Sequence, residues 1–470
     1  YTKEDVTGYM VGATLVPRVL DYCDELSIPF LDLVTENPLR YIHADLLHGY
    51  DAETGAWLRA PGRLEELWGQ DPIHWHELDE AEGVDEICLP GEKWVETFYR
   101  RDRLDALLQD VAGGIVAEVN DLITWNLNSR LLVTDAIDRI EDVETATKMW
   151  TKVTSLSVLD PTCGSGAFLF AAMEALEDIY HHLIDVMRTE EAKSGDASVI
   201  VEEIERHPND RYFVRKSIAL NNLYGTDLMP DAIETAQLRI FLALVSCLES
   251  KTEIEPLPDL AFNLKCGNLV VGFSDLDDLE RFGADLLSRL ALENLGPAIE
   301  EYKANYERFV DASKRGDAAA SIREKESLLL LGEQLREQTD AAFAEIEGIA
   351  PAKVEEWLAD YRPFHWFIEF PKVIQTGGFD VIIGNPPYIA KKNLSAEEVR
   401  LINTYRTRQC PDFYAVCYER SLTLLEASAG RHAFVVMLNL AFSRDFSTLR
   451  ELISEAASNE WWSTFGKRPD

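Results

Sequence analysis

Five short apolar runs alternate with long stretches of helical periodicity from residue 151 onward. Each run is short, apolar and β-prone, and long helical stretches separate the runs. Strands that alternate with helices predict a mostly parallel β-sheet covered by helices on both faces. The predicted strands cover residues 156–159, 222–226, 260–265, 379–383 and 432–437.

Helical periodicity dominates the rest of the chain. Residues 1–150 have a mainly helical pattern, interrupted by a polar, proline-containing stretch at 37–91. Residues 275–361 are rich in Ala, Leu, Glu, Arg and Gln and place apolar residues at helical spacing, which favours an inserted helical hairpin with a structural role. We therefore expect an N-terminal helical region, 1–150, followed by an α/β domain, 151–470, that contains this insertion.

Composition narrows the class of protein. The 470 residues are 46% apolar, which is enough for a large core, and the net charge is −38. Such acidity excludes binding to a polyanion over the whole surface, so any DNA contact requires a local basic patch. No apolar run approaches the roughly 20 residues of a membrane helix, and the N-terminus lacks a signal-peptide pattern. The seven cysteines form no C-x-x-C pair, so we expect a cytoplasmic protein without a structural metal.

A glycine turn follows the first predicted strand. The sequence SVLDPTCGSGAFLF, residues 157–170, indicates a strand that ends at Asp160 and turns through Gly164 and Gly166 into a helix. Glycines at such a turn let a ligand approach backbone amides at a helix N-terminus. Leu169 stands where a dinucleotide fingerprint needs a third glycine. Asp160 favours a ligand that carries an ammonium group over one that carries a pyrophosphate.

Two polar residues follow the next two strands. Asp227 ends the second strand, where a carboxylate is well placed to bind both hydroxyls of a ribose. The alternative is that Asp227 only caps the helix that opens at Pro230. Asn268 follows the third strand, where its amide can bind an adenine edge or can form an ordinary turn.

The fourth strand leads into the tetrapeptide Asn385-Pro386-Pro387-Tyr388. An aromatic exocyclic amine is a poor nucleophile because its lone pair is delocalised into the ring. The side-chain oxygen of Asn385 and the carbonyl of Pro386 can accept both N–H groups and favour a pyramidal nitrogen, whose lone pair turns toward an electrophile. Proline fixes the backbone, and Tyr388 offers a face for stacking on a flat base. We expect this loop and the glycine turn to lie at neighbouring strand ends.

In this order, the motifs resemble those of the gamma-type N6-adenine DNA methyltransferases of large bacterial phage-defence enzymes. That group includes type IIG restriction-modification proteins and BREX methyltransferases, and the resemblance leaves the two contexts and their partner proteins open. It covers nearly the whole chain and implies a Rossmann-like sheet that binds S-adenosylmethionine. It further implies site-specific methyl transfer to the N6 amine of an adenine flipped out of double-stranded DNA.

The resemblance assigns roles to residues that match the motifs. Asn268 departs from the family, since many members have aspartate there. Smaller relatives begin with Tyr-Thr-Pro in a segment that packs on the methionine end of the cofactor, and Lys3 replaces that proline here. The implied catalytic residues are Asn385, Pro386, Pro387 and Tyr388. The implied cofactor contacts are Tyr1, Thr2, Asp160, Pro161, Gly164, Gly166, Phe168, Asp227 and Asn268.

A locally basic stretch follows the tetrapeptide, at residues 391–409. Its cations are candidate contacts to DNA phosphates, and the alternative is an ordinary charged helix face. The candidate DNA-binding residues are Lys391, Lys392, Arg406 and Arg408.

Family members continue after the fifth strand with an antiparallel hairpin, an aromatic that stacks on the flipped base, and a target-recognition domain. The chain ends one predicted helix after that strand. We therefore expect a fragment that binds cofactor and is impaired as a catalyst on its own. A non-enzymatic alternative is a fold that has kept cofactor binding and lost catalysis.

Three other activities use parts of the same pattern. Enzymes that methylate a glutamine amide on translation release factors share the loop, but their chains are short and lack the insertion. Enzymes that methylate the N4 amine of cytosine more often have serine in place of Asn385. A loose nuclease pattern, PD…ExK, matches Pro230-Asp231 and 249–251, but Asp231 opens a predicted helix.

Overall fold

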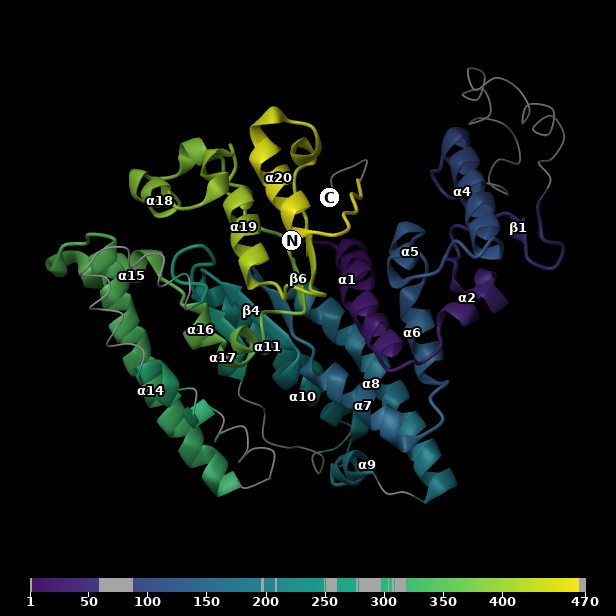
Figure 1. Ribbon diagram of the computed structural model, residues 1–470, viewed down its shortest axis with the longest axis horizontal. Coiled ribbons are helices and arrows are strands. Elements are labelled where there is room, and N and C mark those ends of the chain that lie inside the picture. The colour runs from purple at the N-terminus through teal and green to yellow at the C-terminus, as the bar shows by residue number, and fades with distance from the viewer. Residues whose placement is uncertain are drawn as a thin grey trace. The chain divides into compact units, whose positions relative to one another are not determined.

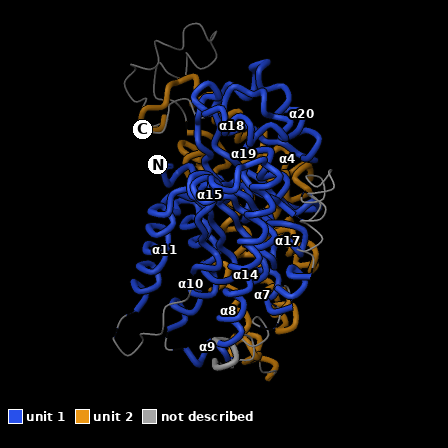
Figure 2. Tube along the Cα trace, turned by 90° about the vertical axis from the view of Figure 1, so that its left-hand side faces the viewer, with its two compact units in different colours: residues 1–18, 151–177, 202–470 blue, residues 19–150, 178–201 orange. Residues whose placement is uncertain are grey.

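The computed structural model describes residues 2–58, 88–195, 198–207, 209–248, 250, 260–275, 278, 297–302, 304–306, 308 and 318–464. The chain divides into two compact units, coloured separately in Figure 2. In the described part of the chain, no helix combines the length and the apolar character that a membrane span needs.

Unit 1 comprises Tyr1–Arg18, Thr151–Glu177 and Glu202–Asp470, and unit 2 comprises Val19–Trp150 and Asp178–Val201.

Unit 1 is built on a five-stranded parallel sheet with the order β5-β4-β3-β6-β7. Each predicted strand overlaps one of these strands, so the α/β class and the five strands are confirmed. The strands alternate with helices along the chain (Figure 1). Their bounds are β3 (Val158–Asp160), β4 (Leu223–Asp227), β5 (Leu264–Cys266), β6 (Val381–Gly384) and β7 (Arg431–Phe434).

The two faces of the sheet are covered by different segments. Successive strand residues point to opposite faces. On β4, Tyr224 packs edge-to-face on Phe370, with ring centroids 5.4 Å apart, and on Phe379 at 5.5 Å. A Cβ at the next residue, Gly225, would instead lie 3.0 Å from Leu169 of α8. The rings of Phe370 and Phe379 and helix α8 therefore bury opposite faces of the sheet, as the apolar strands predict.

The strand order places the topological switch point between β3 and β6. The chain leaves the central strand β3 toward β4 on one side and returns to β6 on the other. Hydrogen bonds join the amino ends of β3 and β6. The carboxylate of Asp380, just before β6, accepts from the backbone N–H and the hydroxyl of Ser157, just before β3, at 2.9 Å each. In open parallel sheets, ligands bind beyond the carboxyl ends of the strands at such a point.

Helices of unit 1 flank the sheet and extend beyond it. Helices α14 and α15 lie in the predicted insertion, of which residues 279–296 and 309–317 fall outside the described residues. Helices α19 and α20 lie side by side (Figure 1). The α-helices lying wholly or partly in unit 1 are α1 (Glu4–Glu25), α7 (Val143–Ser155), α8 (Ala167–Ser194), α9 (Val199–Ile204), α10 (Asp210–Asn221), α11 (Pro230–Val245), α14 (Ala318–Ile346), α15 (Val354–Tyr361), α16 (Trp366–Glu369), α17 (Pro371–Gln375), α18 (Ala396–Leu401), α19 (Tyr414–Leu424) and α20 (Ser447–Ala456). The 3-10 helices of unit 1 are η5 (Leu260–Phe262), η6 (Pro351–Lys353), η7 (Lys391–Asn393), η8 (Arg406–Gln409), η9 (Leu438–Ala441) and η10 (Arg444–Phe446).

Unit 2 is mainly helical in its described part, as the periodicity of residues 1–150 predicts. Part of the polar stretch, residues 59–87, lies outside the described residues. The ion pair between Arg40 and Asp135, at 2.6 Å, joins η1 to α6 within this unit. Besides parts of α1, α7, α8 and α9, unit 2 contains α2 (Leu31–Glu36), η1 (Pro38–Tyr41), the antiparallel pair β1 (Tyr50–Asp51) and β2 (Ala56–Trp57), α4 (Trp94–Ala112), α5 (Val119–Thr124) and α6 (Ser129–Ile137).

Candidate active site

The glycine turn and the Asn385 loop lie next to each other at the carboxyl edge of the sheet. The Thr162 hydroxyl, in the turn after β3, donates to the backbone oxygen of Asn385 over 3.3 Å. The strands also approach closely, since a Cβ at Gly384 would lie 2.9 Å from Asp160 Oδ1. The expectation that the two loops share one edge of the sheet is thus confirmed.

Asp227 connects the end of β4 to the glycine turn. Its Oδ2 accepts from the Gly164 N–H at 2.9 Å, and its Oδ1 accepts from the Met229 N–H at 2.9 Å. The second contact is a local turn before α11, whose N-cap residue Met229 has no side-chain capping bond, so the capping alternative is not supported. The first contact links Asp227 to the glycine turn. Carboxylate oxygens have further lone pairs, so ribose binding by Asp227 stays a prediction.

The glycines of the turn adopt a backbone that other residues avoid. Gly164 has φ +51° and Gly166 has φ +83°, both left-handed. A Cβ at Gly166 would also lie 3.4 Å from the Cβ of Ala236 in α11. The turn therefore depends on glycine for its conformation, and Gly166 lies against α11.

Asp160 is a buried acid without a basic partner. Its side chain is 1% exposed, and in the described part of the chain it accepts only from the Thr162 N–H, at 3.2 Å. Burial raises the pKa of Asp160 to about 8, and the nearby charge of Asp227 adds to this. A buried carboxylate with no cation beside it is a favourable partner for an ammonium group.

Asn385 is held by hydrogen bonds from two directions. Its Nδ2 donates to Thr2 Oγ1 at 3.2 Å, while the Tyr388 hydroxyl lies 2.7 Å from Asn385 Oδ1 and 2.9 Å from the Val435 oxygen. A hydroxyl has one proton, so Tyr388 can donate to only one of these oxygens at a time. Asn385 Oδ1 is therefore open to another N–H donor whenever Tyr388 donates to Val435.

Tyr388 presents an aromatic ring at the mouth of the site. The residue is 41% exposed, and its ring meets Tyr414 of α19 edge-on with centroids 6.0 Å apart. Burial raises the pKa of the Tyr388 hydroxyl to about 12, with a smaller contribution from Asp412. Tyr388 thus stays protonated at physiological pH, and Tyr414 limits the positions of its ring.

The other candidate residues near the turn have mainly structural contacts. The Pro161 oxygen accepts from the Thr226 hydroxyl at 2.8 Å, and Phe168 is buried in the core. Pro386 is buried and Pro387 half-buried. Tyr1 lies outside the described residues. Roles for these residues in binding or catalysis stay predictions.

Asn268 forms the turn that was its alternative role. Its Oδ1 accepts from the Val270 N–H at 3.1 Å, and its own backbone N–H donates to the Arg362 oxygen at 2.9 Å. The side-chain amide nitrogen retains two N–H donors for a base edge, so adenine contact stays a prediction.

The structure distinguishes between the cations of the basic stretch. The Lys391 ammonium donates to the Arg408 oxygen at 2.5 Å and to Gln409 Oε1 at 3.2 Å, which brings two candidates together. Arg406 forms an ion pair with Glu455 at 2.6 Å. Lys392 is exposed and has no polar partner among the described residues. Of the four candidates, Lys392 is thus the most available to a phosphate.

Sequence reasoning missed a contact that supports the turn. Arg239 of α11 donates to the Ser165 carbonyl at 2.7 Å and to its hydroxyl at 3.2 Å. The guanidinium also stacks on Phe170, 4.5 Å from the ring centroid. No local pattern identifies Arg239, because its partners are about 70 residues away in the chain.

The alternative nuclease pattern gains no support. Asp231 lies in the first turn of α11, where its carbonyl accepts from the Thr235 hydroxyl. Glu249 and Lys251 lie outside the described residues. Within the described part of the chain, no group of three or more His, Cys, Asp or Glu is arranged to hold a metal ion.

Comparison with known proteins agrees with the fold. The family described as Eco57I restriction-modification methylase matches residues 221–468, and the MmeI DNA-methyltransferase domain matches residues 137–271. A protein of Methanocaldococcus jannaschii, whose name gives it the inferred role of type II restriction enzyme and methyltransferase, is 26% identical over 424 residues. These residues make up 78% of this chain and 34% of that relative, so the chain spans about a third of the relative's length.

The fold and these matches define the class as a methyltransferase domain of restriction-modification type. The chain belongs to the Eco57I restriction-modification methylase family.

Proposed function

We propose that this protein transfers a methyl group from S-adenosylmethionine to the N6 amine of an adenine flipped out of double-stranded DNA, as part of a restriction-modification or other phage-defence system. The observation that carries the proposal is the hydrogen bond from Thr162 to the Asn385 backbone. It joins the turn suited to a cofactor and the loop suited to an amine, so that a small group could pass between them.

The residues around the glycine turn fit S-adenosylmethionine. The buried acid Asp160, which has no cation beside it among the described residues, suits the ammonium of the cofactor, and Asp227 suits its ribose hydroxyls. A Cβ at Gly164 would meet nothing within 4 Å, so the backbone there is open to a ligand. When bound, the cofactor supplies a methyl group on a positively charged sulfur, which is the electrophile that an amine needs.

The Asn385 loop would activate the amine without a strong base. Asn385 Oδ1 and the Pro386 carbonyl would each accept one N–H, which holds the nitrogen pyramidal and directs its lone pair toward the methyl group. The Thr2 hydroxyl oxygen accepts from the amide nitrogen of Asn385 and helps to hold the amide in place. The amine nitrogen would form one new N–C bond while the bond between the methyl carbon and sulfur breaks and its electron pair stays on sulfur. The amine nitrogen would then lose one proton to water. Tyr388 would stack on the flipped base.

Titration calorimetry with S-adenosylmethionine tests the proposal. Asp227→Ala should weaken cofactor binding, because it removes both the ribose acceptor and the link to Gly164. Asn385→Ala should bind cofactor nearly as well as the unaltered protein and should lose methyl transfer. An unaltered protein that does not bind S-adenosylmethionine would contradict the proposal, as would an Asn385→Ala variant that transfers methyl groups at the normal rate.

A further inference from the structure

Arg362 has a backbone conformation that is unusual for its residue type. It ends α15 with φ +44° and ψ +64°, in the left-handed region. Such a conformation is unfavourable for a long side chain, and the following proline restricts it further. Among the described residues other than glycine, only Ser27, Asn126 and Arg362 have positive φ. The contacts of Arg362 must offset the strain.

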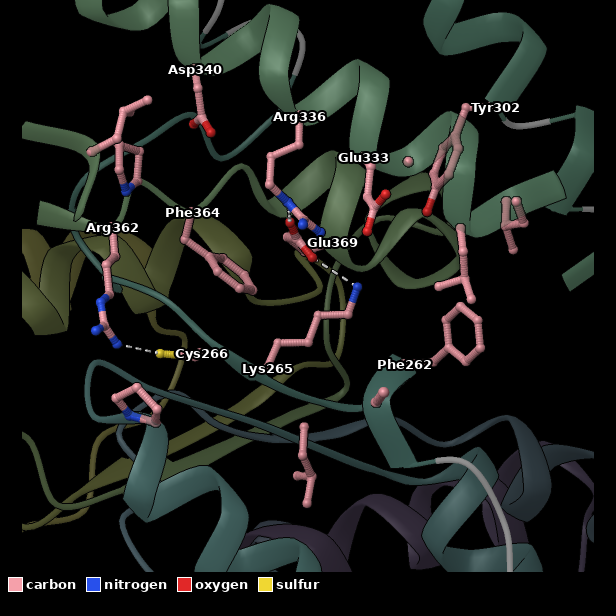
Figure 3. A pocket seen from close by; sticks show the side chains of 18 residues that line it. Phe262, Lys265, Cys266, Tyr302, Glu333, Arg336, Asp340, Arg362, Phe364 and Glu369 are labelled. Atoms are coloured by element: carbon pink, nitrogen blue, oxygen red, sulfur yellow. Dashed lines mark hydrogen bonds and ion pairs between the residues drawn. The ribbon is translucent and has the colours of Figure 1, made fainter. Parts of the chain in front are cut away.

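Those contacts join the loops after two neighbouring strands. The guanidinium donates to Cys266 Sγ at 3.0 Å (Figure 3). It also donates to the Leu228 carbonyl at 3.1 Å. The Arg362 carbonyl accepts from the Asn268 N–H at 2.9 Å. Leu228 follows Asp227 at the end of β4, while Cys266 and Asn268 lie at the end of β5. One residue, directly after the predicted insertion, thus contacts both of the loops that would bracket the cofactor's base.

The residues after Arg362 pack closely against the loop that follows β5. The Phe364 N–H donates to Val271 at 2.8 Å, and the Trp366 N–H donates to Phe273 at 3.0 Å. A Cβ at Gly267 would lie 2.1 Å from the Phe364 ring, and one at Gly272 would lie 2.3 Å from the Phe364 carbonyl oxygen. This close backbone packing fixes the position from which Arg362 reaches the strand ends.

Arg362 also differs from the other cations nearby. It lines a cavity of about 600 Å³ between β5 and α14 (Figure 3). The other two cations that line this cavity, Lys265 and Arg336, pair with the buried Glu369 at 2.8 and 2.6 Å. Arg362 has no carboxylate partner among the described residues. Its Nε donates to the Ala359 carbonyl of α15 at 3.4 Å, and its Nη1 donates to the two strand ends.

We propose that Arg362 is a positioning residue for the adenosine end of the cofactor. It holds the loops after β4 and β5 at the separation that lets Leu228 and Asn268 lie on either side of the base. This inference rests on the proposed function, because it takes S-adenosylmethionine as the ligand of that edge. It assigns a cofactor-supporting role to the residue that directly follows the helical insertion.

The variant Arg362→Gly separates positioning from folding. Glycine accepts the left-handed backbone without strain, so the midpoint of thermal unfolding should not fall. The Kd for S-adenosylmethionine, measured by calorimetry, should rise about tenfold, the equivalent of one charged hydrogen bond. Arg362→Lys should give a smaller rise in Kd, because an ammonium keeps a charged donor but lacks the planar guanidinium whose Nη1 contacts both acceptors. Arg139→Ala, which removes an exposed ion pair with Glu36 in unit 2, is the matched control and should leave the Kd unchanged.

A double-mutant cycle with Asn268→Ala gives a second readout. If both residues act on the same end of the cofactor, their effects on the Kd should be non-additive. Additive effects, an unchanged Kd in Arg362→Gly, or a loss of affinity that only parallels a lower unfolding midpoint would each overturn the inference. Failure of the unaltered protein to bind S-adenosylmethionine would instead overturn the proposed function, and the inference with it.

Discussion

The hydroxyl of Thr162 donates a hydrogen bond to the backbone oxygen of Asn385, which is 223 positions later in the chain. Thr162 belongs to the glycine turn after β3, and Asn385 opens the double-proline loop after β6. Because β3 and β6 are parallel neighbours in the centre of the sheet, this bond connects the two halves of the candidate site at the switch point. The separation of the two loops is therefore set by the sheet and by one side chain.

Thr162→Val removes this hydroxyl while keeping the shape of the side chain. We expect a loss of about 1 kcal/mol in the free energy of unfolding, typical of one hydrogen bond. We also expect methyl transfer to fall more than cofactor affinity, because the turn keeps its own contacts with Asp227. Single-turnover rates and calorimetry on the same preparation test this, with Thr162→Ser as the variant that keeps the hydroxyl. A rate equal to that of the unaltered protein would show that the bond does not position the loop.

Asp160→Asn should change how stability depends on pH. Burial raises the pKa of Asp160 to about 8 in the folded protein, from an ordinary value of 3.8. Between these values the folded state holds a proton that the unfolded state releases. The contribution of Asp160 to stability is thus complete below about pH 4 and is lost as the pH rises to about 8.

Asparagine does not ionise, and its oxygen can still accept from Thr162. At pH 8 the free energy of unfolding of the Asp160→Asn variant should therefore be higher than that of the unaltered protein, by an amount on the order of a few kcal/mol. At pH 5 the difference should be much smaller. Urea unfolding at the two pH values measures the difference. The variant should also bind S-adenosylmethionine more weakly, because a neutral amide attracts an ammonium group less. A stability difference that does not change with pH would contradict this explanation.

Lys392→Glu should weaken DNA binding in a salt-dependent manner. The Lys392 ammonium is exposed and has no polar partner in the described part of the chain, so it can approach a phosphate. Losing one phosphate contact should reduce the slope of log K against log salt by about 1. Lys353→Glu, at an exposed lysine of the insertion, is a control for the change in net charge. Equal effects of the two substitutions would indicate a general charge effect instead of a local contact.

The two functions of Tyr388, ring and hydroxyl, can be separated. Tyr388→Phe keeps the stacking surface and removes a competitor for Asn385 Oδ1, so methyl transfer should be retained. Tyr388→Ala should weaken binding of a flipped base by roughly 1–3 kcal/mol, which is the typical loss when alanine replaces an aromatic residue that stacks on a base. Because burial raises the pKa of Tyr388 to about 12, the unaltered protein and Tyr388→Phe should have the same pH–rate profile up to pH 9. A large loss of activity in Tyr388→Phe would assign the hydroxyl a direct role.

The fold could be predicted from the sequence because its signals are local. Apolar runs mark each strand, and the rule that parallel strands end at a common edge brings Asp160 and Asn385 together without knowledge of the structure. The contacts that hold the site were not predictable in this way. Thr162 with Asn385, and Arg362 with Cys266, join residues 223 and 96 positions apart, and no periodicity carries such pairings.

The basic stretch shows the same limit. Its composition indicates a cationic surface, but only the structure shows that the Arg406 charge is paired with Glu455, which is 49 positions away. Charge counted along a sequence therefore overestimates the charge available to DNA. The turn formed by Asn268 was anticipated only as one of two roles, since an asparagine after a strand satisfies either one with the same atoms.

The most direct test of the central claim identifies the nucleoside that receives the methyl group. The protein, in excess over duplex DNA that lacks methylated adenine, is incubated with S-adenosylmethionine carrying a deuterated methyl group, and the digested DNA is analysed by mass spectrometry. We expect labelled N6-methyladenine with the unaltered protein and none with Asn385→Ala. Label in N4-methylcytosine or in a protein glutamine, with none in adenine, would contradict the account.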